Sequence, residues 1–478
     1  MPTRVVTLSG ADTEVPEEAL AQLRMTVRGN VLVPGDPAFA EIRRPYNAMH
    51  PGSPALVVRA SGTADVIDAV NFARENGLLL AVRGGGHSVA GLSSVDGGML
   101  LDLALMNGVD VDPDARIVRV QGGALWGDVD RETQVFGLVA PGGVVSDTGV
   151  AGLTLGGGEG WVRRKHGLSC DNVVSAQVVT ADGQVRTASA DVNPDLFWAI
   201  RGGGGNFGVV TSLTFTLHPL GPMVAFAGVF YPAADAAQVL RGFREWAATA
   251  PDEVTALWGC TTLPAHEQLP PEIHDTPFVV VGAVYAGDVD EGMDVLAPLR
   301  ELGTPLVDIS QPLPFVGVQA AFDPFFQRGD LRSYWKSTYL GELTDQAVDL
   351  IAGRAQNRPS ERTFVVVFLM GGEINRLSAA DTAYSERSAP WMVSIDGNWT
   401  DPAQDSAVIS WAREAWGEVA ELGTGGVYLN FTGLDDEAPT TGVDRGYGDN
   451  MRRLAEIKAK YDPTNLFRLN NNIVPEGG

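Results

Sequence analysis

The sequence predicts an α+β protein built from two kinds of unit, and three stretches of the chain support this. From Pro54 to about Leu220, short apolar strands alternate with helices and glycine-rich loops. From about Val224 to Val393, longer β-rich runs alternate with helices, which is typical of a large sheet faced by helices on one side. The chain then returns to one helix and an asparagine-rich tail.

The first elements show why strands and helices alternate in this way. Ala55–Arg59 is an apolar run that predicts a strand, and Thr63 is a candidate N-cap for a helix over Ala64–Asn76. Apolar side chains recur on one face of that helix, and Gly77 ends it. Leu78–Val82 is then a continuous apolar run, which predicts a buried strand that leads directly into a glycine loop.

The remaining elements follow from the same patterns. In the first unit, a helix is expected from about Leu125, and strands are expected over Met99–Leu103, Ile117–Val120, Val173–Thr180, Val185–Ala188 and Val209–Leu217. In the second unit and beyond it, strands are expected over Phe278–Tyr285 and Thr363–Leu369, and helices over Ala234–Thr249, Asp345–Gly353 and Asn450–Lys460. No internal repeat is visible.

Composition and charge exclude several classes of protein. The chain has 478 residues, of which 45% are hydrophobic and 19% charged, as in ordinary globular enzymes. Its formal net charge of −25 repels nucleic acid and anionic membranes, so we expect neither as a partner. Two cysteines cannot form a disulfide framework, and no apolar run approaches a membrane span. Residues 1–20 lack the apolar core of a signal peptide, so we expect a cytoplasmic protein.

The most informative stretch is Arg83–Ser88, in which three consecutive glycines lie between an arginine and a histidine. Residues without a Cβ atom adopt positive φ angles readily and can point successive N–H groups at one anion. The loop is therefore a candidate site for a phosphate or pyrophosphate, with Arg83 available to offset the charge. His87 would lie beside that group. Taken alone, the stretch is more often a solvated glycine turn followed by an ordinary histidine, and the rest of the chain changes that balance.

Two further glycine clusters, Leu155–Trp161 and Arg201–Gly208, have a similar composition. Gly203, Gly205 and Gly208 match the dinucleotide pattern G-x-G-x-x-G, but a strand follows them, whereas that fingerprint must open a helix. The glycines instead allow the backbone to lie close against a large flat ligand. No P-loop, zinc-type spacing of histidines and cysteines, or G-x-S-x-G elbow occurs, so we expect no metal site and no serine-hydrolase chemistry.

A series of motifs in a fixed order resembles one family of enzymes. The motifs are Arg83–Ser88, Gly142–Gly143, Thr148–Gly152, Leu155–Gly160, Arg164–Leu168, Asp171–Asn172, Pro194–Trp198, Arg201–Gly208, Tyr428–Phe431 and Tyr461–Arg468. They span nearly the whole chain and are similar to those of berberine-bridge-enzyme-like FAD-linked oxidases, of the vanillyl-alcohol oxidase and p-cresol methylhydroxylase superfamily. The resemblance implies a two-part FAD-binding domain, over residues 1–220 and 437–478. It also implies a substrate-binding domain over 221–436, with a large antiparallel sheet faced by helices.

The resemblance gives His87 a covalent role. In relatives, this histidine bonds to the 8α carbon of the isoalloxazine ring, for which a neutral imidazole nitrogen is a suitable nucleophile. Many relatives add a second bond from a cysteine, but Val145 takes that position here. Cys170 lies well beyond that motif and is interpreted as a small buried side chain. We therefore expect FAD to be attached through His87 only.

The motifs of the family also imply the other contacts to FAD. The expected contacts besides His87 are Arg83, Gly84, Gly85, Gly86, Ser88, Gly142, Thr148, Gly149, Gly152, Gly158, Gly160, Asn172, Val209, Asn470 and Asn472. Thr148 departs from the Val or Leu that relatives often carry beside flavin C4a, where O₂ must approach, so the electron acceptor is left open. The tail of relatives reads Asn-Gln-Asn-Ile, and the amide side chains of Asn470 and Asn472 still suit a flavin contact.

Three residues are candidates for proton transfer. The Tyr-x-Asn motif of relatives makes Tyr428 the base, although a tyrosine titrates at about pH 10 and needs a cation or hydrogen bonds to act near neutrality. Asp381 is the second candidate, because some plant relatives place a catalytic Glu six residues before an arginine, here Arg387. His166 matches a Tyr or His beside the flavin in relatives. A packed tyrosine, an acidic turn residue and a structural histidine are the alternatives.

The resemblance implies the oxidation of a small organic molecule. The protein would orient a substrate C–H toward flavin N5 and remove a proton from the adjacent O–H or N–H group. O₂ is the expected acceptor, giving H₂O₂. The alternatives are a dehydrogenase with another acceptor and a non-catalytic protein that sequesters a flavin or drug. We expect a monomer or a homodimer.

Aromatic residues of the second unit are candidates for the substrate pocket. They are Tyr334, Trp335, Trp391 and Trp399. Aromatic residues at this density more often belong to a core.

Overall fold

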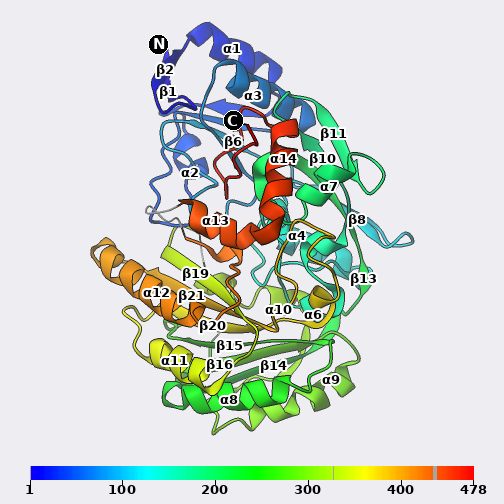
Figure 1. Cartoon of the computed structure of the whole chain (residues 1–478), viewed down its shortest axis with the longest axis vertical. Coiled ribbons are helices and arrows are strands. Elements are labelled where there is room, and N and C mark those ends of the chain that lie inside the picture. The colour runs from blue at the N-terminus through cyan, green and yellow to red at the C-terminus, as the bar shows by residue number, and fades with distance from the viewer. Residues whose placement is uncertain (1, 268, 327, 434–438, 478) are drawn as a thin grey trace.

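The computed structural model describes residues 2–267, 269–326, 328–433 and 439–477. In Figure 1, the N-terminal strands and helices and the helix α14 (Met451–Tyr461) lie at one end, and the largest sheet with its covering helices lies at the other. Helices combined with a large antiparallel sheet confirm the predicted α+β class. Within the described ranges, no helix has both the length and the apolar character that a bilayer span requires.

A four-stranded sheet supports the glycine loop. Its order is β3 (Asn30–Leu32), β4 (Leu56–Arg59), β6 (Met99–Asp102) and β5 (Leu80–Arg83), of which the last three are parallel. Helices α1 (Glu17–Thr26) and α3 (Thr63–Glu75) share its apolar core. Because β5 ends at Arg83, the glycine loop leaves the carboxyl end of a buried parallel strand, where sheets of this kind commonly bind ligands.

The start of α3 differs by one residue from the prediction. Gly62, not Thr63, is the N-cap residue. Thr63 Oγ1 donates instead to Oε1 of Gln177 at 3.0 Å, so its hydroxyl joins the helix to a neighbouring strand.

A five-stranded antiparallel sheet completes the first domain. Its order is β11 (Val185–Ser189), β10 (Val173–Val179), β12 (Val209–Thr216), β8 (Ile117–Gln121) and β7 (Val109–Asp112). Helices α4 (Trp126–Gln134), α5 (Val150–Leu155), α7 (Pro194–Ala199) and α14 contribute to its core.

The C-terminal segment packs on this first domain. The Nζ atom of Lys458, in α14, is fully buried and lies 2.7 Å from a carboxylate oxygen of Asp462. It also donates to the carbonyl oxygens of Asn206 (2.7 Å) and Phe467 (2.9 Å). The hydrogen bond to Asn206 holds the segment against the loop before β12. The exact domain boundaries stay predictions.

The second domain is built on an eight-stranded sheet. Its order is β17 (Val307–Asp308), β14 (Met223–Pro232), β16 (Phe278–Tyr285), β15 (Val254–Thr261), β20 (Phe364–Leu369), β21 (Trp391–Trp399) and β19 (Arg332–Leu340), with β18 (Gln311–Pro314) paired to β14. Every pairing is antiparallel, as the resemblance implied.

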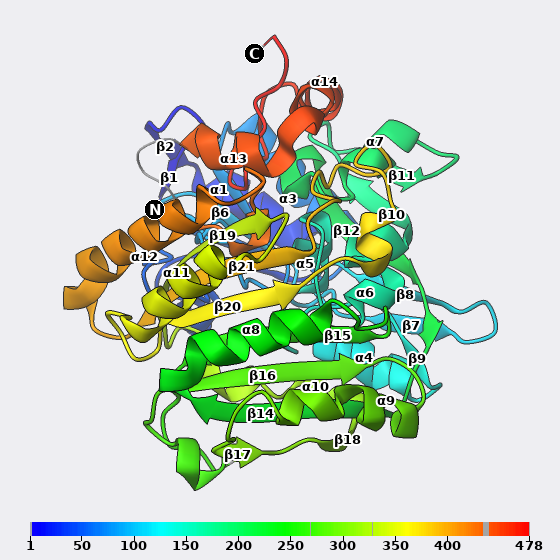
Figure 2. The same ribbon diagram turned by 60° about the horizontal axis from the view of Figure 1, so that its bottom comes forward.

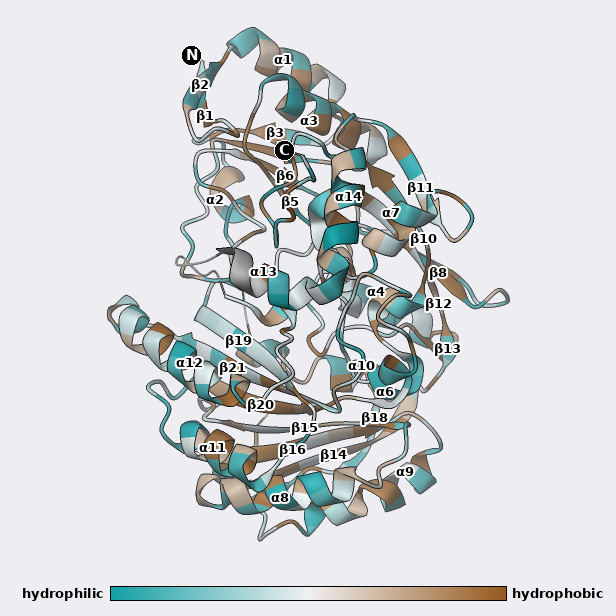
Figure 3. Ribbon diagram, in the orientation of Figure 1, coloured by the Kyte–Doolittle hydropathy of each residue, from teal (hydrophilic) through white to brown (hydrophobic). Residues whose placement is uncertain are grey.

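Helices cover one face of this sheet, and the first domain covers the other. Figure 2 shows α8 (Ala236–Ala247), α11 (Asp345–Gln356) and α12 (Asp405–Ala420) on one face. Along β20, Val365 and Val367 pack under these helices, whereas Phe364, Val366 and Phe368 pack on the opposite side. Both faces of the sheet are buried, and β14, β16 and β20 are apolar at most positions, whereas β19 and β21 carry several buried polar side chains (Figure 3).

The remaining described helices and strands are short and connect these layers. They are β1 (Thr3–Val6), β2 (Asp12–Val15), β9 (Leu138–Val139), β13 (His218–Pro219), α2 (Phe39–Ile42), α6 (Arg163–His166), α9 (Val289–Leu296), α10 (Phe315–Gln319) and α13 (Pro439–Tyr447).

Candidate active site

A cavity of about 300 Å³ is lined by both domains. One side, the glycine wall, is backbone from Gly84, Gly85, Gly86, Gly143, Gly149, Gly152, Gly156, Gly204, Gly205 and Gly208. The other side, the sheet wall, consists of the side chains of Leu257, Phe322, Phe326, Trp335, Phe364, Val366, Phe368, Asp396 and Phe431. The cavity thus has one backbone side and one side-chain side.

Close backbone contacts explain why Gly84 and Gly85 in the glycine wall carry no side chains. A Cβ atom on Gly85 would lie 2.3 Å from the Cα atom of Gly149, and one on Gly84 would lie 2.9 Å from the carbonyl oxygen of Gly122. Gly86 has a φ of +76°, a conformation that other residues rarely adopt. These glycine loops therefore pack closely on neighbouring backbone, and their own backbone is left open to the cavity.

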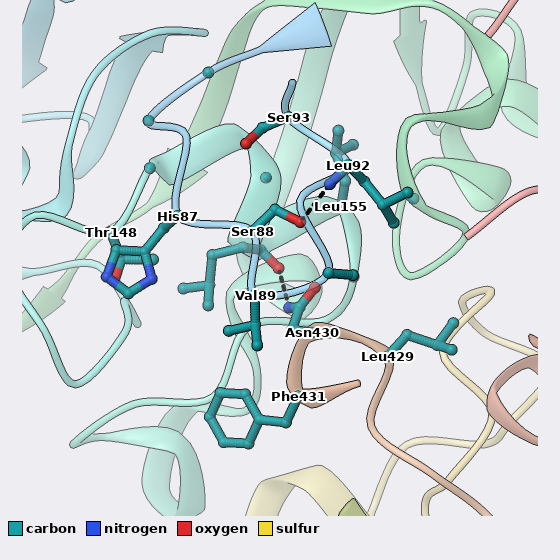
Figure 4. A pocket seen from close by; sticks show the side chains of 18 of the residues that line it. His87, Ser88, Val89, Leu92, Ser93, Thr148, Leu155, Leu429, Asn430 and Phe431 are labelled. Carbon is teal, nitrogen blue, oxygen red and sulfur yellow. Dashed lines mark hydrogen bonds between the residues drawn. The ribbon is translucent and has the colours of Figure 1, made fainter. Parts of the chain in front are cut away.

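His87 lies in the cavity wall next to Thr148 (Figure 4). Its ring stacks on that of Tyr46, with the centroids 3.8 Å apart and the planes at 26°. Its Nε2 atom lies 3.0 Å from Oδ1 of Asp147, but the two atoms are not aligned for a hydrogen bond. The ring is thus held between two neighbours at the edge of the cavity.

Arg83 does not line the cavity, whereas Ser88 does. The guanidinium of Arg83 donates to the carbonyl oxygens of Ile42 (2.5 Å) and Ser93 (3.0 Å), and burial lowers its pKa to about 10. The structure therefore contradicts the expectation that Arg83 faces a phosphate, because its donors fix the surrounding loops instead. The Oγ atom of Ser88 accepts the N–H of Leu92 at 3.1 Å (Figure 4).

The other predicted FAD contacts divide into two groups. Those that line the cavity are Thr148, Gly149, Gly152 and Asn470. Those that do not line it are Gly142, Gly158, Gly160, Asn172, Val209 and Asn472. Members of the second group support the walls from behind. A Cβ atom on Gly160 would lie 1.8 Å from the carbonyl oxygen of Gly142, and the Asn172 amide donates to the carbonyl oxygens of His166 (2.8 Å) and Leu168 (2.9 Å).

Asp396 is a functional candidate that sequence reasoning missed. It lies on β21, lines the cavity and is 5% exposed, and its carboxylate accepts a hydrogen bond from the Ser394 hydroxyl. Burial, assisted by the nearby Glu159, raises the pKa of Asp396 to about 7. A buried acid that titrates near neutrality in a cavity is a candidate general base. A single charge within an apolar strand is the signal that could have identified it.

Tyr428 is fully buried and is not one of the lining residues. Its phenol oxygen accepts the N–H groups of Gly158 (3.1 Å) and Glu159 (3.3 Å) and the Nδ2 amide of Asn430 (2.9 Å). Burial, followed by the charge of Glu159, raises the pKa of Tyr428 above its ordinary value despite these bonds. The phenol is therefore protonated at neutral pH, and the residues that follow it, Leu429 to Thr432, line the cavity in its place (Figure 4).

Neither Asp381 nor His166 lines the cavity. Asp381 lies on an exposed turn, where its Oδ2 atom accepts the N–H of Ser378 at 2.9 Å. This placement contradicts its prediction as a base, because an exposed carboxylate outside the cavity cannot reach a substrate bound there. The ring of His166 stacks on that of His218 at 3.9 Å, and burial, then His218 and Lys165, lower its pKa to about 3. The structural alternative fits His166.

The position at which many relatives carry a second flavin-linking cysteine lies in the cavity wall. Val145 is one of the lining residues, whereas Cys170 is fully buried elsewhere. Burial raises the pKa of the Cys170 thiol well above its ordinary value, so it is an unreactive thiol. Among the described residues, no three His, Cys, Asp or Glu side chains gather as a metal site.

Glu159 is a second carboxylate of the cavity that the sequence did not single out. It lies among the glycines of Leu155–Trp161, and a single acidic residue between glycines is the sequence feature that could have identified it. Its Oε2 atom lies 3.0 Å from Nη1 of Arg163, and both side chains are almost fully buried.

The residues around the cavity fit the FAD that the sequence implies. A slot lined by glycine backbone suits a flat ring system, because side chains there would fill it. Asn470 adds an amide oxygen that is buried, has no hydrogen-bond partner and belongs to a lining residue. Such an atom requires a donor from a ligand or water.

Comparisons with known proteins identify the family of this chain. A family model described as an FAD binding domain matches residues 54–189, and one described as berberine and berberine like matches residues 427–474. The (R)-6-hydroxynicotine oxidase of Paenarthrobacter nicotinovorans is 32% identical over 474 residues, which cover 95% of this chain and 98% of that protein. An FAD-linked oxidoreductase of Dictyostelium discoideum is 30% identical over 456 residues, covering 94% and 95%.

Solved structures show the same fold. The crystal structure of 6-hydroxy-D-nicotine oxidase from Arthrobacter nicotinovorans matches with a TM-score of 0.82 and 31% identity, over 95% of this chain and 99% of that chain. A chitooligosaccharide oxidase matches with a TM-score of 0.82 and 25% identity, over 96% and 100%. The chain therefore belongs to the berberine-bridge-enzyme-like family and is an FAD-dependent oxidoreductase.

Proposed function

We propose that the protein is an oxidase that removes a hydride and a proton from an alcohol or amine group of a small molecule and passes two electrons to O₂. The observation that carries this proposal is Asp396, a buried carboxylate that shares one cavity with the glycine wall. An alcohol would become a carbonyl compound and an amine an imine, while O₂ takes up two electrons and two protons as H₂O₂. By their names, the similar proteins include oxidases of a nicotine derivative and of an oligosaccharide.

The glycine wall would hold the cofactor. Bound FAD would supply the hydride acceptor and the route of the two electrons to O₂. Residues 84–88 and 148–152 would lie against it, with Asn470 as an amide contact. Backbone N–H groups of glycine loops can donate to such a ligand without intervening side chains.

Asp396 would accept the proton from the substrate O–H or N–H group at a carboxylate oxygen. A general base works best when its pKa lies near the working pH, and the pKa of about 7 meets this condition. The hydrogen bond from Ser394 fixes the orientation of the carboxylate. Tyr428, by contrast, keeps its proton at neutral pH and would act by holding the loop that carries Glu159.

Aromatic side chains of the sheet wall would orient the substrate and exclude water. The rings of Trp335 and Phe431 meet edge to face with centroids 5.5 Å apart, and Phe326 meets Trp335 in the same way at 6.3 Å. A dry surrounding strengthens the electrostatic interactions of Asp396 with a bound substrate.

Covalent attachment through His87 is part of the proposal. Tyr46 stacks on the imidazole and orients it, and Asp147 lies 3.0 Å from Nε2. When the other ring nitrogen forms a bond to carbon, the imidazole must lose the Nε2 proton, and Asp147 stands where it can take it. Val145 at the position of the second link supports a single bond.

One observation favours an electron acceptor other than O₂. Thr148 lines the cavity beside His87, where relatives often carry Val or Leu, and a polar side chain there favours a dehydrogenase that uses another acceptor. A cytoplasmic location and a monomeric or homodimeric state stay predictions from the sequence.

Anaerobic titration with a panel of amines and alcohols tests the proposal. An oxidase substrate should bleach the visible flavin band, and air should restore the band with one H₂O₂ formed per substrate consumed. Bleaching that air does not reverse, but an artificial dye does, would indicate the dehydrogenase. A flavin band that no compound bleaches would favour the sequestration protein.

A further inference from the structure

Glu159 is a buried carboxylate without hydrogen-bond partners at the cavity. The side chain is 2% exposed, lines the cavity, and neither Oε1 nor Oε2 accepts a hydrogen bond. An ionised carboxylate offers about four acceptor positions, and leaving them empty in a buried site is costly. Such a group in a folded protein calls for a ligand that supplies donors.

Arg163 offsets the negative charge of this carboxylate but donates no hydrogen bond to its oxygens. Its Nη1 atom lies 3.0 Å from Oε2 of Glu159, but Nη1 donates to the carbonyl oxygen of Gly160 (3.0 Å), and Nη2 donates to those of Ala256 (3.2 Å) and Leu369 (2.9 Å). The guanidinium is therefore fixed to the backbone. It provides a positive charge nearby and leaves the acceptor positions of Glu159 to the cavity.

The surroundings of Glu159 favour a cationic donor. The lining residues include Glu159 and Asp396 but, within the described chain, no lysine or arginine. Phe322, Phe326 and Trp335 form part of the sheet wall, and the faces of aromatic rings attract cations. A polyhydroxylated substrate would need polar partners along this aromatic run, and Trp335 already donates its Nε1–H to Asn398.

We propose that Glu159 is the substrate-anchoring residue of the cavity, and that it accepts hydrogen bonds from the protonated amine of an aromatic or alicyclic substrate. This inference rests on the proposed function and specifies its substrate class. Burial raises the pKa of the Glu159 carboxyl, and Arg163 opposes that rise. An arriving ammonium group favours the anion further, so the charged form is the one that binds.

Two probes of nearly equal shape test the anchor on the FAD-loaded protein. They are 2-phenylpropan-2-amine, which is protonated at neutral pH, and 2-phenylpropan-2-ol, which is neutral. Neither has a C–H bond on the carbon that carries the nitrogen or oxygen, so neither can be oxidised. Titration calorimetry with wild type should give a Kd for the amine at least about 10-fold below that for the alcohol, as expected for a charge-assisted hydrogen bond.

Substitutions of Glu159 test whether this side chain is the residue that binds the amine. Glu159→Gln should raise the Kd of the amine by about 10- to 100-fold and leave the Kd of the alcohol unchanged. Glu342→Gln, on the exposed surface after β19, is the matched control and should change neither Kd. If Glu159→Gln does not fold, Glu159→Asp is the second variant, because it keeps the charge but shortens the side chain by one methylene group. It should raise the Kd of the amine and leave the Kd of the alcohol unchanged.

Three results would overturn the assignment. They are equal affinity of wild type for the two probes, an unchanged amine Kd in the Glu159 variants, and loss of the amine preference in Asp396→Asn instead. Because the probes are inert, these results are independent of turnover. An enzyme that oxidises nothing in the panel could still show the anchor, and an active oxidase could lack it.

Discussion

The glycine wall and the sheet wall enclose one cavity but are built in opposite ways. In the glycine wall the backbone itself lies against the cavity, because neighbouring atoms occupy the space that a side chain at Gly84 or Gly85 would need. In the sheet wall, side chains from β15, β19, β20 and β21 reach the cavity from strands that are distant in the sequence.

This difference separates two functions. A substitution at Gly84 or Gly85 in the glycine wall adds atoms where none fit, so it should affect whether the cofactor binds. A substitution in the sheet wall exchanges one side chain for another, so it should affect which substrate binds and how fast it reacts. The following predictions test this division, beginning with the largest effect.

Gly85→Ala should abolish flavin binding. The added Cβ atom would lie 2.3 Å from the Cα and 2.5 Å from the N atom of Gly149, and these are backbone atoms that cannot move aside as the end of a flexible side chain can. The ratio of visible flavin absorbance to protein concentration measures the effect. Gly353→Ala, inside α11 with no atom within 4 Å of the new Cβ, is the control and should keep a full complement of flavin. A yellow Gly85→Ala protein would contradict the close packing of this wall.

Asp396→Asn should keep its flavin and slow flavin reduction by about 10²–10⁴, the usual cost of losing a general base. Wild-type kcat/KM should rise with pH as the carboxyl loses its proton at about 7, and the variant should lack this rise. Asp381→Asn, at the exposed turn, is the control and should retain both the rate and the pH dependence.

The stability of the same variant provides a check on folding. The folded state raises the pKa of Asp396 above that of the unfolded chain, so the folded form binds more protons between about pH 4 and pH 7. Stability contributed by this group is therefore lost as the pH rises through that range. At pH 8, Asp396→Asn should unfold at no lower temperature than wild type, and a lower Tm would show that the amide disturbs the site.

His87→Ala should bind FAD without a covalent bond and turn over more slowly. Acid precipitation should leave the yellow colour with the wild-type polypeptide and release it from the variant. Cys170→Ser is the matched control, because that thiol is buried away from the cavity, and its flavin should stay attached. Release of all flavin from wild type would refute covalent attachment, and release from Cys170→Ser would refute the single link.

Tyr428→Phe should have the smallest effect on rate, less than about 10-fold, with the pH dependence retained. The change removes an acceptor from three donors, the N–H groups of Gly158 and Glu159 and the amide of Asn430, so stability should fall by about 1–3 kcal/mol. Stopped-flow reduction and thermal unfolding measure the two effects. A loss of 10²–10⁴ together with loss of the pH dependence would instead make Tyr428 the base, as its motif predicts.

The glycine wall could be predicted from the sequence because its information is local. An apolar run followed by Arg83–Ser88 places three glycines after a strand, and β5 does end at Arg83. Even there, the role expected of Arg83 was wrong, because its guanidinium donates to the carbonyl oxygens of Ile42 and Ser93, which no motif pairs with it. Motif spacing identifies backbone turns better than it identifies the partners of a long side chain.

The residues of the sheet wall could not be predicted, because the register of each strand decides which of its side chains face the cavity. Tyr334 and Trp335 are neighbours on β19, yet Tyr334 packs in the core under the helices and Trp335 lines the cavity. Asp381 followed a family motif and lies on the surface, whereas Asp396 had no motif and lies in the cavity. A shift of one residue along a strand exchanges its two faces, and one sequence does not fix that shift.

The packing of α14 and the residues after it against the first domain determines the order in which the enzyme can be assembled. During translation the Arg83–Ser88 loop leaves the ribosome early, but Asn470 and Asn471, which complete the same cavity, emerge only after every strand of the large sheet. The cofactor can therefore be enclosed only once the sheet has been made.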